Sequence, residues 1–304
     1  MQFKRPKKNI NGILLLDKPL GFSSNQALQK IKWLLQAAKA GHTGTLDPLA
    51  TGLLPLCFGE ATKFAHFLTE ADKTYVATLK LGAVTNTGDA EGEVIASSPV
   101  NVSSAEFAAA CEQFVGEISQ TPPMYSALKH EGKALYEYAR AGIEIAREAR
   151  KVTIHQIAVN YFAGDVAEIT VRCSKGTYIR TLAEDVGKSL GCGAHLIGLR
   201  RTATAGYDIA QTLTLQQFEQ MTESQRLAAL APPDSAVQYL PAMVLDNDAA
   251  YYLLQGQSVW HSGKIPAGLL RLYDTQNRFL GLGEQQADGK IAPKRLMQLQ
   301  NNQN

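Results

Sequence analysis

The chain has 304 residues, of which 45% are hydrophobic, and this is enough apolar material for one large domain or for a large and a small one. Lysine and arginine number 30 against 28 acidic residues, so the total charge does not indicate a nucleic-acid-binding protein, and any basic surface must come from the distribution of charge. The cysteines lie far apart without C-x-x-C spacing, which favours neither a zinc site nor a disulfide framework: Cys57, Cys111, Cys173 and Cys192.

The first predicted elements are a strand and a helix. An apolar run at residues 12–16 ends in turn residues 17–21 and is too short for a signal peptide. Ser23 and Gln26 form a capping box, and apolar residues recur behind them at helical spacing, which predicts a helix from about residue 24 to 39. No stretch is long enough to span a membrane, so we expect a cytoplasmic protein.

The helix leads into residues 41–55, whose sequence GHTGTLDPLATGLLP contains three glycines and two prolines and cannot be regular structure. Pro48 biases Asp47 away from the helical region, so Asp47 lies on a shaped loop. One histidine and one carboxylate are too few ligands for a divalent metal ion. A lone carboxylate can act as a nucleophile or a base. From the loop alone, however, an ordinary Asp-Pro turn is the favoured interpretation.

Strands and a helix follow this loop. Residues 53–58 predict a buried strand, residues 60–68 a helix, and residues 73–82 a half-buried strand on which Tyr75 points inward. An inward tyrosine is usually part of a core, with its hydroxyl satisfied. Residues 103–114 predict a second capped helix.

The middle of the chain combines a charged segment with a hairpin. Residues 124–151 interleave basic and aromatic side chains with four glutamates, a composition that is typical of a solvated helix. Residues 152–162 and 166–173 predict a hairpin. Residues 174–187 pass from a strand into a helix with Arg180 at the junction, where an arginine usually extends to solvent.

The last third predicts short elements and a small β-rich module. A strand at residues 193–206 precedes two short helices, and residues 231–234 are typical of a linker. A helix near residues 248–254 leads into four short apolar runs, at 258–260, 269–273, 279–283 and 290–296. We expect the polar Gln/Asn tail to be disordered.

Separate blocks of the sequence, in order, resemble the motifs of the TruB family of tRNA pseudouridine synthases. The resemblance extends from residue 12 to residue 206. The blocks are K-P-L-G-F-S-S at 18–24, the run at 41–55, K-T-Y at 73–75, P-P-M-Y-S-A-L-K at 122–129, G-T-Y-I-R-T-L-A-E-D-V-G at 176–187 and G-A-H-L-I-G-L-R-R-T at 193–202.

The resemblance implies a role for each candidate residue. Asp47 is expected to be the catalytic nucleophile, and Arg180 to pair with it so that the carboxylate stays ionised and aimed. Tyr75 is expected to stack on a flipped base and to help remove a proton from it, while His42 fills the gap that the base leaves. The other expected substrate contacts are Lys18, Tyr178 and Leu199 in the pocket, Lys129 in an RNA-gripping insertion at about 124–151, and Arg200 and Arg201 on phosphates. Core packing remains the alternative for Leu199, and a hydrogen-bonded loop residue for His42.

The fold that the resemblance implies is α+β. A catalytic domain with a mixed, largely antiparallel sheet and flanking helices would occupy residues 1–232, and a small β-rich PUA-like RNA-binding module residues 233–304. The implied reaction turns the uridine at position 55 of the tRNA T loop into pseudouridine by base flipping, Asp-dependent cleavage of the glycosidic bond, rotation of uracil and rejoining through carbon. We expect no metal and no cofactor, since no phosphate-cradling glycine motif occurs. The expected partner is the T arm of tRNA, bound by a monomer that also assists tRNA folding.

Two other classes of protein fit parts of the sequence. A non-catalytic RNA-binding or tRNA-folding protein would keep its cellular function without the Asp47 carboxylate. A base-exchanging enzyme with an aspartate nucleophile would release free uracil. The sequence also leaves open whether Asp47 attacks the sugar or assists an elimination.

Overall fold

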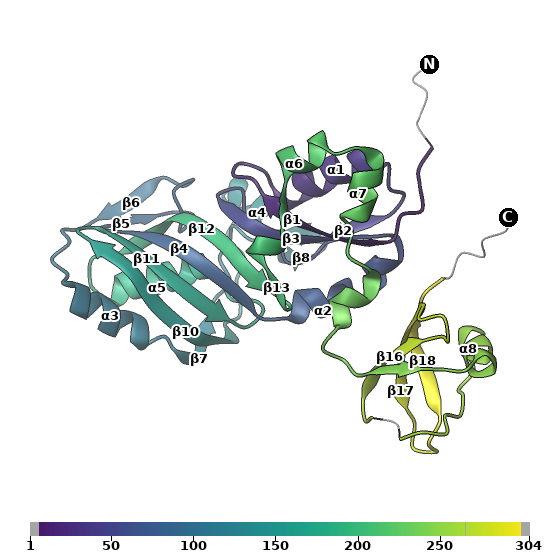
Figure 1. Ribbon diagram of the computed structural model, residues 1–304. Coiled ribbons are helices and arrows are strands. Elements are labelled where there is room, and N and C mark those ends of the chain that lie inside the picture. Colours follow the sequence, from purple (N-terminus) through teal and green to yellow (C-terminus); the bar gives the residue numbers. More distant parts are fainter. Residues whose placement is uncertain (1–5, 265, 299–304) are drawn as a thin grey trace.

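The computed structural model describes residues 6–264 and 266–298 (Figure 1). The end of the Gln/Asn tail, residues 299–304, lies outside the described residues. Within the described part, no helix is both long and apolar enough to cross a membrane.

Within the described residues, ten strands form one large sheet. Its order is β14-β1-β3-β12-β4-β11-β10-β7, with β2 added to β3 and β13 to β12. Two pairs, β1–β14 and β3–β12, are parallel, and the other described pairs in this sheet are antiparallel. The strands are β1 Gly12–Lys18, β2 Ala40–His42, β3 Ala50–Phe58, β4 Lys73–Leu81, β7 Gly116–Gln120, β10 Arg150–Ala163, β11 Val166–Cys173, β12 Ala194–Thr204, β13 Tyr207–Asp208 and β14 Leu213–Thr214. The predicted mixed, largely antiparallel sheet is confirmed.

Helices flank this sheet (Figure 1). Three of them, α1 Ser24–Leu35, α3 Ser104–Glu112 and α5 Ile179–Ser189, pack their apolar faces into the main core. The shorter helical segments are η1 Gly59–Lys63, α2 Ala65–Glu70, α4 Leu135–Arg140, η2 Ile209–Gln211, α6 Leu215–Gln220, α7 Glu223–Ala228 and η3 Pro233–Val237. Both capping boxes predicted from the sequence, at Ser23 and at Ser103, are present.

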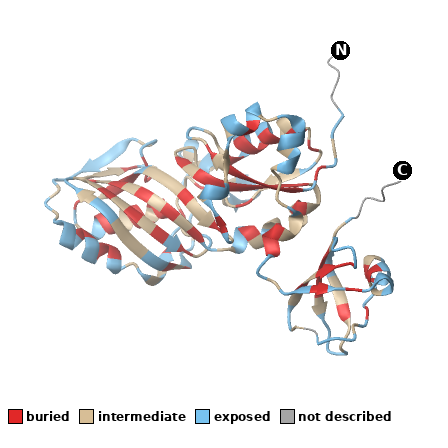
Figure 2. Ribbon diagram, viewed as in Figure 1, coloured by how far each residue is buried: buried red, intermediate tan, exposed pale blue. Residues whose placement is uncertain are grey.

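The burial of β3 and β4 explains their sequence patterns (Figure 2). On β3, Leu54 and Leu56 face the main core, whereas Leu53 and Cys57 face a second buried cluster, so the strand is apolar throughout. On β4 every second residue is buried, and Tyr75 points inward as predicted. The strand that was predicted at residues 53–58 is longer than expected, because β3 begins at Ala50.

Two predicted helices differ from the structure. The helix expected to reach residue 39 ends at Leu35, because Gln36 adopts a left-handed conformation with φ 56°. After the helix ends, the backbone pairs with Lys8 instead: the Lys8 carbonyl accepts from Ala38 N at 2.9 Å. The helix expected at 60–68 is broken at Phe64 into η1 and α2.

The C-terminal part of the described chain contains a four-stranded sheet in the order β15-β16-β17-β18. The elements are β15 Ala242–Val244, α8 Asn247–Leu254, β16 Leu269–Tyr273, β17 Phe279–Gln285 and β18 Ile291–Leu296. The strand expected at 258–260 is reduced to one bridge, between Val259 and Ile291.

The two sheets are joined by the second buried cluster, which we call the junction cluster. Its members come from both parts of the chain: Ile13, Leu15, Leu53, Cys57, Ala61, Phe64, Leu68, Tyr207, Ala236, Val237 and Leu282. The rings of Phe64 and Phe279 lie 5.3 Å apart, and Lys63 Nζ donates to the Leu296 carbonyl at 2.9 Å. Residues 231–234 are not a free linker, because the backbone of Ala231 pairs with that of Ile13 through two hydrogen bonds of 2.8 Å.

Candidate functional site

The loop that carries Asp47 connects β2 to β3, which pair with each other. We call residues 43–49 the Asp47 loop. The buried Ser24 at the start of α1 holds it, since its hydroxyl accepts from Leu46 N at 2.8 Å and donates to Leu46 O at 3.0 Å. Gly21 N donates to Pro48 O at 2.9 Å. The K-P-L-G-F-S-S segment thus supports the loop directly.

Asp47 is fixed in two ways. Its backbone carbonyl closes a turn by accepting from Ala50 N at 3.0 Å. Its side chain pairs with Arg180, whose Nη2 lies 3.0 Å from Oδ2. The pair expected from the resemblance is therefore present. The Asp47 side chain remains 38% exposed, so a substrate can reach it, whereas that of Arg180 is 6% exposed.

Arg180, in the first turn of α5, is held by three further groups. It donates to Thr87 O at 2.9 Å and to Tyr125 O at 2.5 Å, and its Nη1 lies 3.7 Å from Asp89 Oδ2. These contacts leave the guanidinium little freedom to move away from Asp47.

Asp89 is a site residue that the sequence interpretation missed. It is 3% exposed, and its Oδ1 accepts from Thr87 Oγ1 at 2.6 Å and from Glu91 N at 3.1 Å. The available signal was a carboxylate within the turn-rich sequence T-N-T-G-D, but a turn aspartate normally needs no further explanation.

The charge state of Asp47 reflects opposing effects. Burial raises the pKa of its carboxyl above the ordinary value, Arg180 acts in the opposite direction, and the nearby Asp89 raises the pKa again. The ion pair thus lowers the pKa of Asp47 but does not outweigh burial in the unbound protein.

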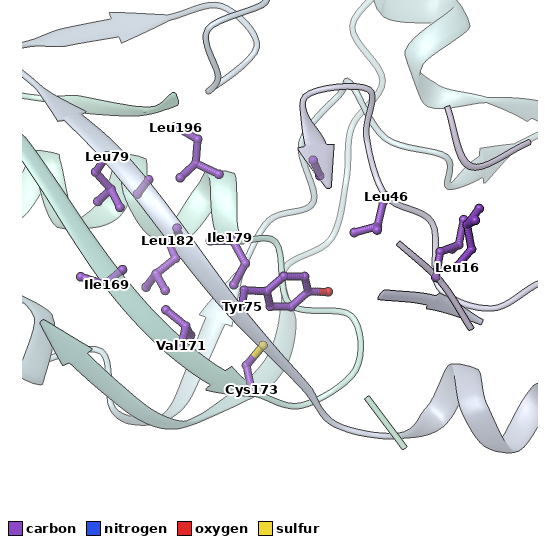
Figure 3. Close-up of a cluster of buried hydrophobic side chains, with 14 of the residues drawn as sticks. Leu16, Leu46, Tyr75, Leu79, Ile169, Val171, Cys173, Ile179, Leu182 and Leu196 are labelled. Atoms are coloured by element: carbon purple, nitrogen blue, oxygen red, sulfur yellow. The ribbon is translucent and has the colours of Figure 1, made fainter. Parts of the chain in front are cut away.

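Tyr75 and Leu199 lie on the neighbouring strands β4 and β12 and share one face of the sheet. Tyr75 is 9% exposed, and Leu199 packs partly buried against the same core. In Figure 3 the Tyr75 ring lies within the buried cluster, with its hydroxyl pointing away from Leu182 and toward the side where Leu46 and Leu16 lie. Burial raises the pKa of Tyr75, so the phenol is protonated at neutral pH.

Lys18, Tyr178 and His42 have different roles around the loop. Lys18 is fully buried and donates to Pro19 O at 2.9 Å, and burial lowers the pKa of its amine to about 8. Tyr178 precedes α5, and its backbone N–H donates to the Gln120 side chain at 3.0 Å. His42 ends β2, and among the described residues its buried Nδ1 has no hydrogen-bond partner. Burial lowers the pKa of His42, which favours the neutral ring.

Arg200 and Arg201 are consecutive on β12 and therefore face opposite sides of the sheet. Arg201 is 1% exposed and donates to Leu53 O at 2.7 Å and to Gly44 O at 3.0 Å. The predicted phosphate contact is wrong for Arg201, because its guanidinium lies inside the protein. Arg200 pairs with Asp17 through two hydrogen bonds of 3.1 and 2.7 Å, and its side chain is 42% exposed. A phosphate contact of Arg200 stays a prediction.

Lys129 lies on the exposed hairpin of β8 Lys129–His130 and β9 Lys133–Ala134. The segment at 124–151 is not one solvated helix, since only α4 within it is helical. Its basic and aromatic side chains pair: Lys133 Nζ lies 4.8 Å from the Tyr138 ring and Arg140 5.5 Å from the Tyr136 ring. A second hairpin is formed by β5 Ala83–Thr85 and β6 Val94–Ser97, of which β6 is exposed.

Two glycines of the 41–55 stretch provide a test of this geometry. Gly52 has φ +101°, and a Cβ there would lie 2.3 Å from the Arg201 carbonyl oxygen, whereas a Cβ at Gly41 would meet nothing within 4 Å. We predict that Gly52→Ala lowers the free energy of unfolding by about 2 kcal/mol or more. Gly41→Ala should change it by less than about 0.5 kcal/mol. Urea unfolding of both variants checks this, and equal stabilities would contradict the close contact of β3 with β12.

The assembled site offers one directed carboxylate beside an aromatic ring and an apolar wall. A carboxylate held this way can attack an electrophilic carbon or accept a proton. An aromatic ring and an apolar side chain are suited to contact a flat, aromatic substrate group. Within the described residues, no group of three or more His, Cys, Asp or Glu side chains is placed to hold a metal ion.

Three family models match the chain. The TruB family pseudouridylate synthase N-terminal domain matches residues 32–179, and the tRNA pseudouridylate synthase B C-terminal domain matches residues 180–250. The model for the C-terminal region of pseudouridine synthase II TruB matches residues 241–297.

Curated relatives are similar over nearly the whole chain. The tRNA pseudouridine synthase B of Methylobacillus flagellatus is 61% identical over 98% of both chains. The proteins of the same name from Chromobacterium violaceum and Pseudomonas putida are 53% identical, over 96% of each chain, and 52% identical, over 97% of this chain and 98% of the relative.

Solved structures agree with the fold. A chain of a Cbf5-Nop10-Gar1 complex is 27% identical with a TM-score of 0.71, over 94% of this chain and 84% of that chain. A chain of an H/ACA RNP bound to a substrate RNA containing 2′-deoxyuridine is 22% identical, with a TM-score of 0.72, over 99% of this chain and 93% of that chain. The second likeness supports the fold alone. The predicted α+β class is confirmed.

Proposed function

Because the chain belongs to the TruB family of pseudouridylate synthases, we propose that it converts uridine 55 in the T loop of tRNA into pseudouridine, with Asp47 as the nucleophile. The observation that carries this proposal is the 3.0 Å ion pair between Asp47 and Arg180, which fixes the direction of a carboxylate that remains 38% exposed. The printed names of the relatives, all tRNA pseudouridine synthase B, support tRNA as the substrate.

The target uridine must leave its stack before it reaches Asp47. We assign the base to the space between Tyr75, which stacks on it, and Leu199, which forms the apolar wall. His42 then fills the gap in the RNA, and its neutral ring favours stacking there over an ion pair with phosphate. Since this requires the tRNA elbow to open, the same binding would assist tRNA folding.

The reaction exchanges one bond to the sugar for another. The bond from C1′ to N1 of uracil breaks, the base rotates, and a bond from C1′ to C5 forms. N1 gains a proton and C5 loses one to solvent. Asp47 either attacks C1′ or promotes an elimination from the sugar, and Tyr75 is our candidate for accepting the C5 proton after its own proton has passed to solvent.

The remaining candidates surround this centre. Lys18 and Tyr178 shape the pocket through the turn that supports the loop and the start of α5. The hairpin with Lys129 and the exposed Arg200 are proposed RNA contacts, as is the small C-terminal module. RNA of this kind would be recognised by its folded shape more than by its sequence.

The test is release of tritium from C5-labelled uridine in an unmodified tRNA transcript. We expect release equivalent to one uridine per tRNA, and none when uridine 55 is replaced by cytidine. Release that persists in the cytidine transcript would reject the T-loop position. Binding without any release would favour a non-catalytic RNA-folding protein, and appearance of free uracil would favour base exchange.

A further inference from the structure

Arg201 is the largest fully buried side chain in the described part of the protein. Its Nε donates to Leu53 O at 2.7 Å and its Nη2 to Gly44 O at 3.0 Å. Among the described residues it forms no ion pair with a carboxylate. Its guanidinium therefore links β3 to the beginning of the Asp47 loop through these two hydrogen bonds.

Tyr75 is the third neighbour of Arg201. The two residues are direct partners in the antiparallel pairing of β12 with β4, and both face the main core. Burial raises the pKa of Tyr75, whereas the positive charge of Arg201 acts in the opposite direction. In Figure 3 the Tyr75 oxygen points toward the side where Leu46 of the Asp47 loop lies, and Arg201 donates to Gly44 of the same loop.

Packing alone does not account for an arginine in this place. A buried charge without an opposite charge is costly, even when carbonyl oxygens accept its hydrogen bonds. The charge of Arg201 also acts on the neighbouring Lys73. The pKa of Lys73 is lowered to about 8, mainly by its own burial and in addition by Arg201. An apolar side chain of similar size would avoid this cost.

We infer that Arg201 is a positioning residue that fixes the Tyr75 hydroxyl relative to the Asp47 loop and stabilises negative charge on that hydroxyl. The inference rests on the proposed function, because it concerns the step in which the rejoined base loses its C5 proton. In that step Tyr75 first loses its own proton to solvent, its phenolate oxygen then takes the proton from C5, and the electrons of the C5–H bond restore the ring double bond. A guanidinium beside the oxygen stabilises the phenolate and so increases the fraction of Tyr75 that can accept the proton.

The test is a double-mutant cycle with Arg201→Lys, Tyr75→Phe and the double variant, measured as single-turnover rates with enzyme in excess. We expect Arg201→Lys alone to slow pseudouridine formation by roughly 100-fold. In the Tyr75→Phe background, the same substitution should cost less than about threefold, because its target oxygen is already absent. Arg172→Met is the matched control, since Arg172 is an exposed arginine on the adjacent β11. It should leave the rate unchanged.

A transcript with deuterium at C5 of uridine adds a second measurement. If Arg201 acts on proton removal, the isotope effect on the single-turnover rate should be larger for Arg201→Lys than for wild type. Additive losses in the cycle, or an unchanged isotope effect, would reduce Arg201 to a structural residue and overturn the inference. Arg201→Gln, which keeps a donor but removes the charge, replaces the lysine variant in both measurements if the latter does not fold. If wild type itself forms no pseudouridine, the proposed function fails, and this is distinct from equal rates of wild type and the Arg201 variants.

Discussion

Replacing Asp47 with Asn is expected to slow pseudouridine formation by roughly 10⁴-fold or more, the size of loss seen when a nucleophile is removed. The amide has the shape of the carboxylate but cannot form a bond to C1′ or carry the negative charge. Arg180 keeps its hydrogen bonds to Thr87 and Tyr125 and its contact with Asp89, so the site should stay folded. Tritium release in single-turnover experiments measures the effect.

Two comparisons make this result specific to catalysis. Asp165→Asn removes another ion-paired carboxylate, at the exposed turn where Asp165 pairs with Lys80, and should leave the rate unchanged. Filter binding should give an affinity of Asp47→Asn for the transcript within a few fold of wild type. A rate within tenfold of wild type would contradict a nucleophilic role for Asp47.

Replacing Arg180 with Met is expected to reduce the rate at pH 7 by roughly 100- to 1,000-fold and to move the acidic limb of the pH profile to higher pH. Burial already raises the pKa of Asp47, and Arg180 is the largest effect that opposes it. Without the guanidinium this pKa rises further, so a smaller fraction of Asp47 is ionised at neutral pH. Activity that needs the carboxylate therefore disappears earlier as the pH falls.

Single-turnover rates between pH 5 and pH 9 check this prediction. Arg226→Met is a suitable control, because Arg226 also donates to backbone carbonyls. It lies on α7 and donates to two carbonyls of α6, not to the groups around Asp47. Its profile should match that of wild type. An acidic limb of Arg180→Met at the wild-type position would mean that Arg180 does not control the ionisation of Asp47.

Local patterns predicted much of the fold because local physics determined it. The alternation of β4 placed Tyr75 inward, and the capping boxes marked the starts of α1 and α3. The end of α1 was misjudged because Gln36 stops the helix through contacts with Lys8, which are tertiary. The broken helix at Phe64 has the same kind of cause, since Phe64 is buried in the junction cluster.

The site was less accessible to pattern arguments. Nothing local relates Asp47 to Arg180, and only the family resemblance brought them together. The error on Arg201 was avoidable in part, because consecutive strand residues face opposite sides and cannot both reach one phosphate chain. Which of the two arginines faces inward depends on the partner strands, as does the burial of Asp89.

The junction cluster has a practical consequence for anyone who wants a smaller enzyme. Leu53 and Phe64 are fully buried there, and Leu53 lies on the strand that follows the Asp47 loop. Cutting the chain before β15 would remove Leu282 and Phe279 from this contact and give water access to apolar side chains, at about 2 kcal/mol for each one exposed. A shortened protein would thus be prone to aggregate and less stable beside its own reactive loop, unless the uncovered surface were redesigned with polar residues.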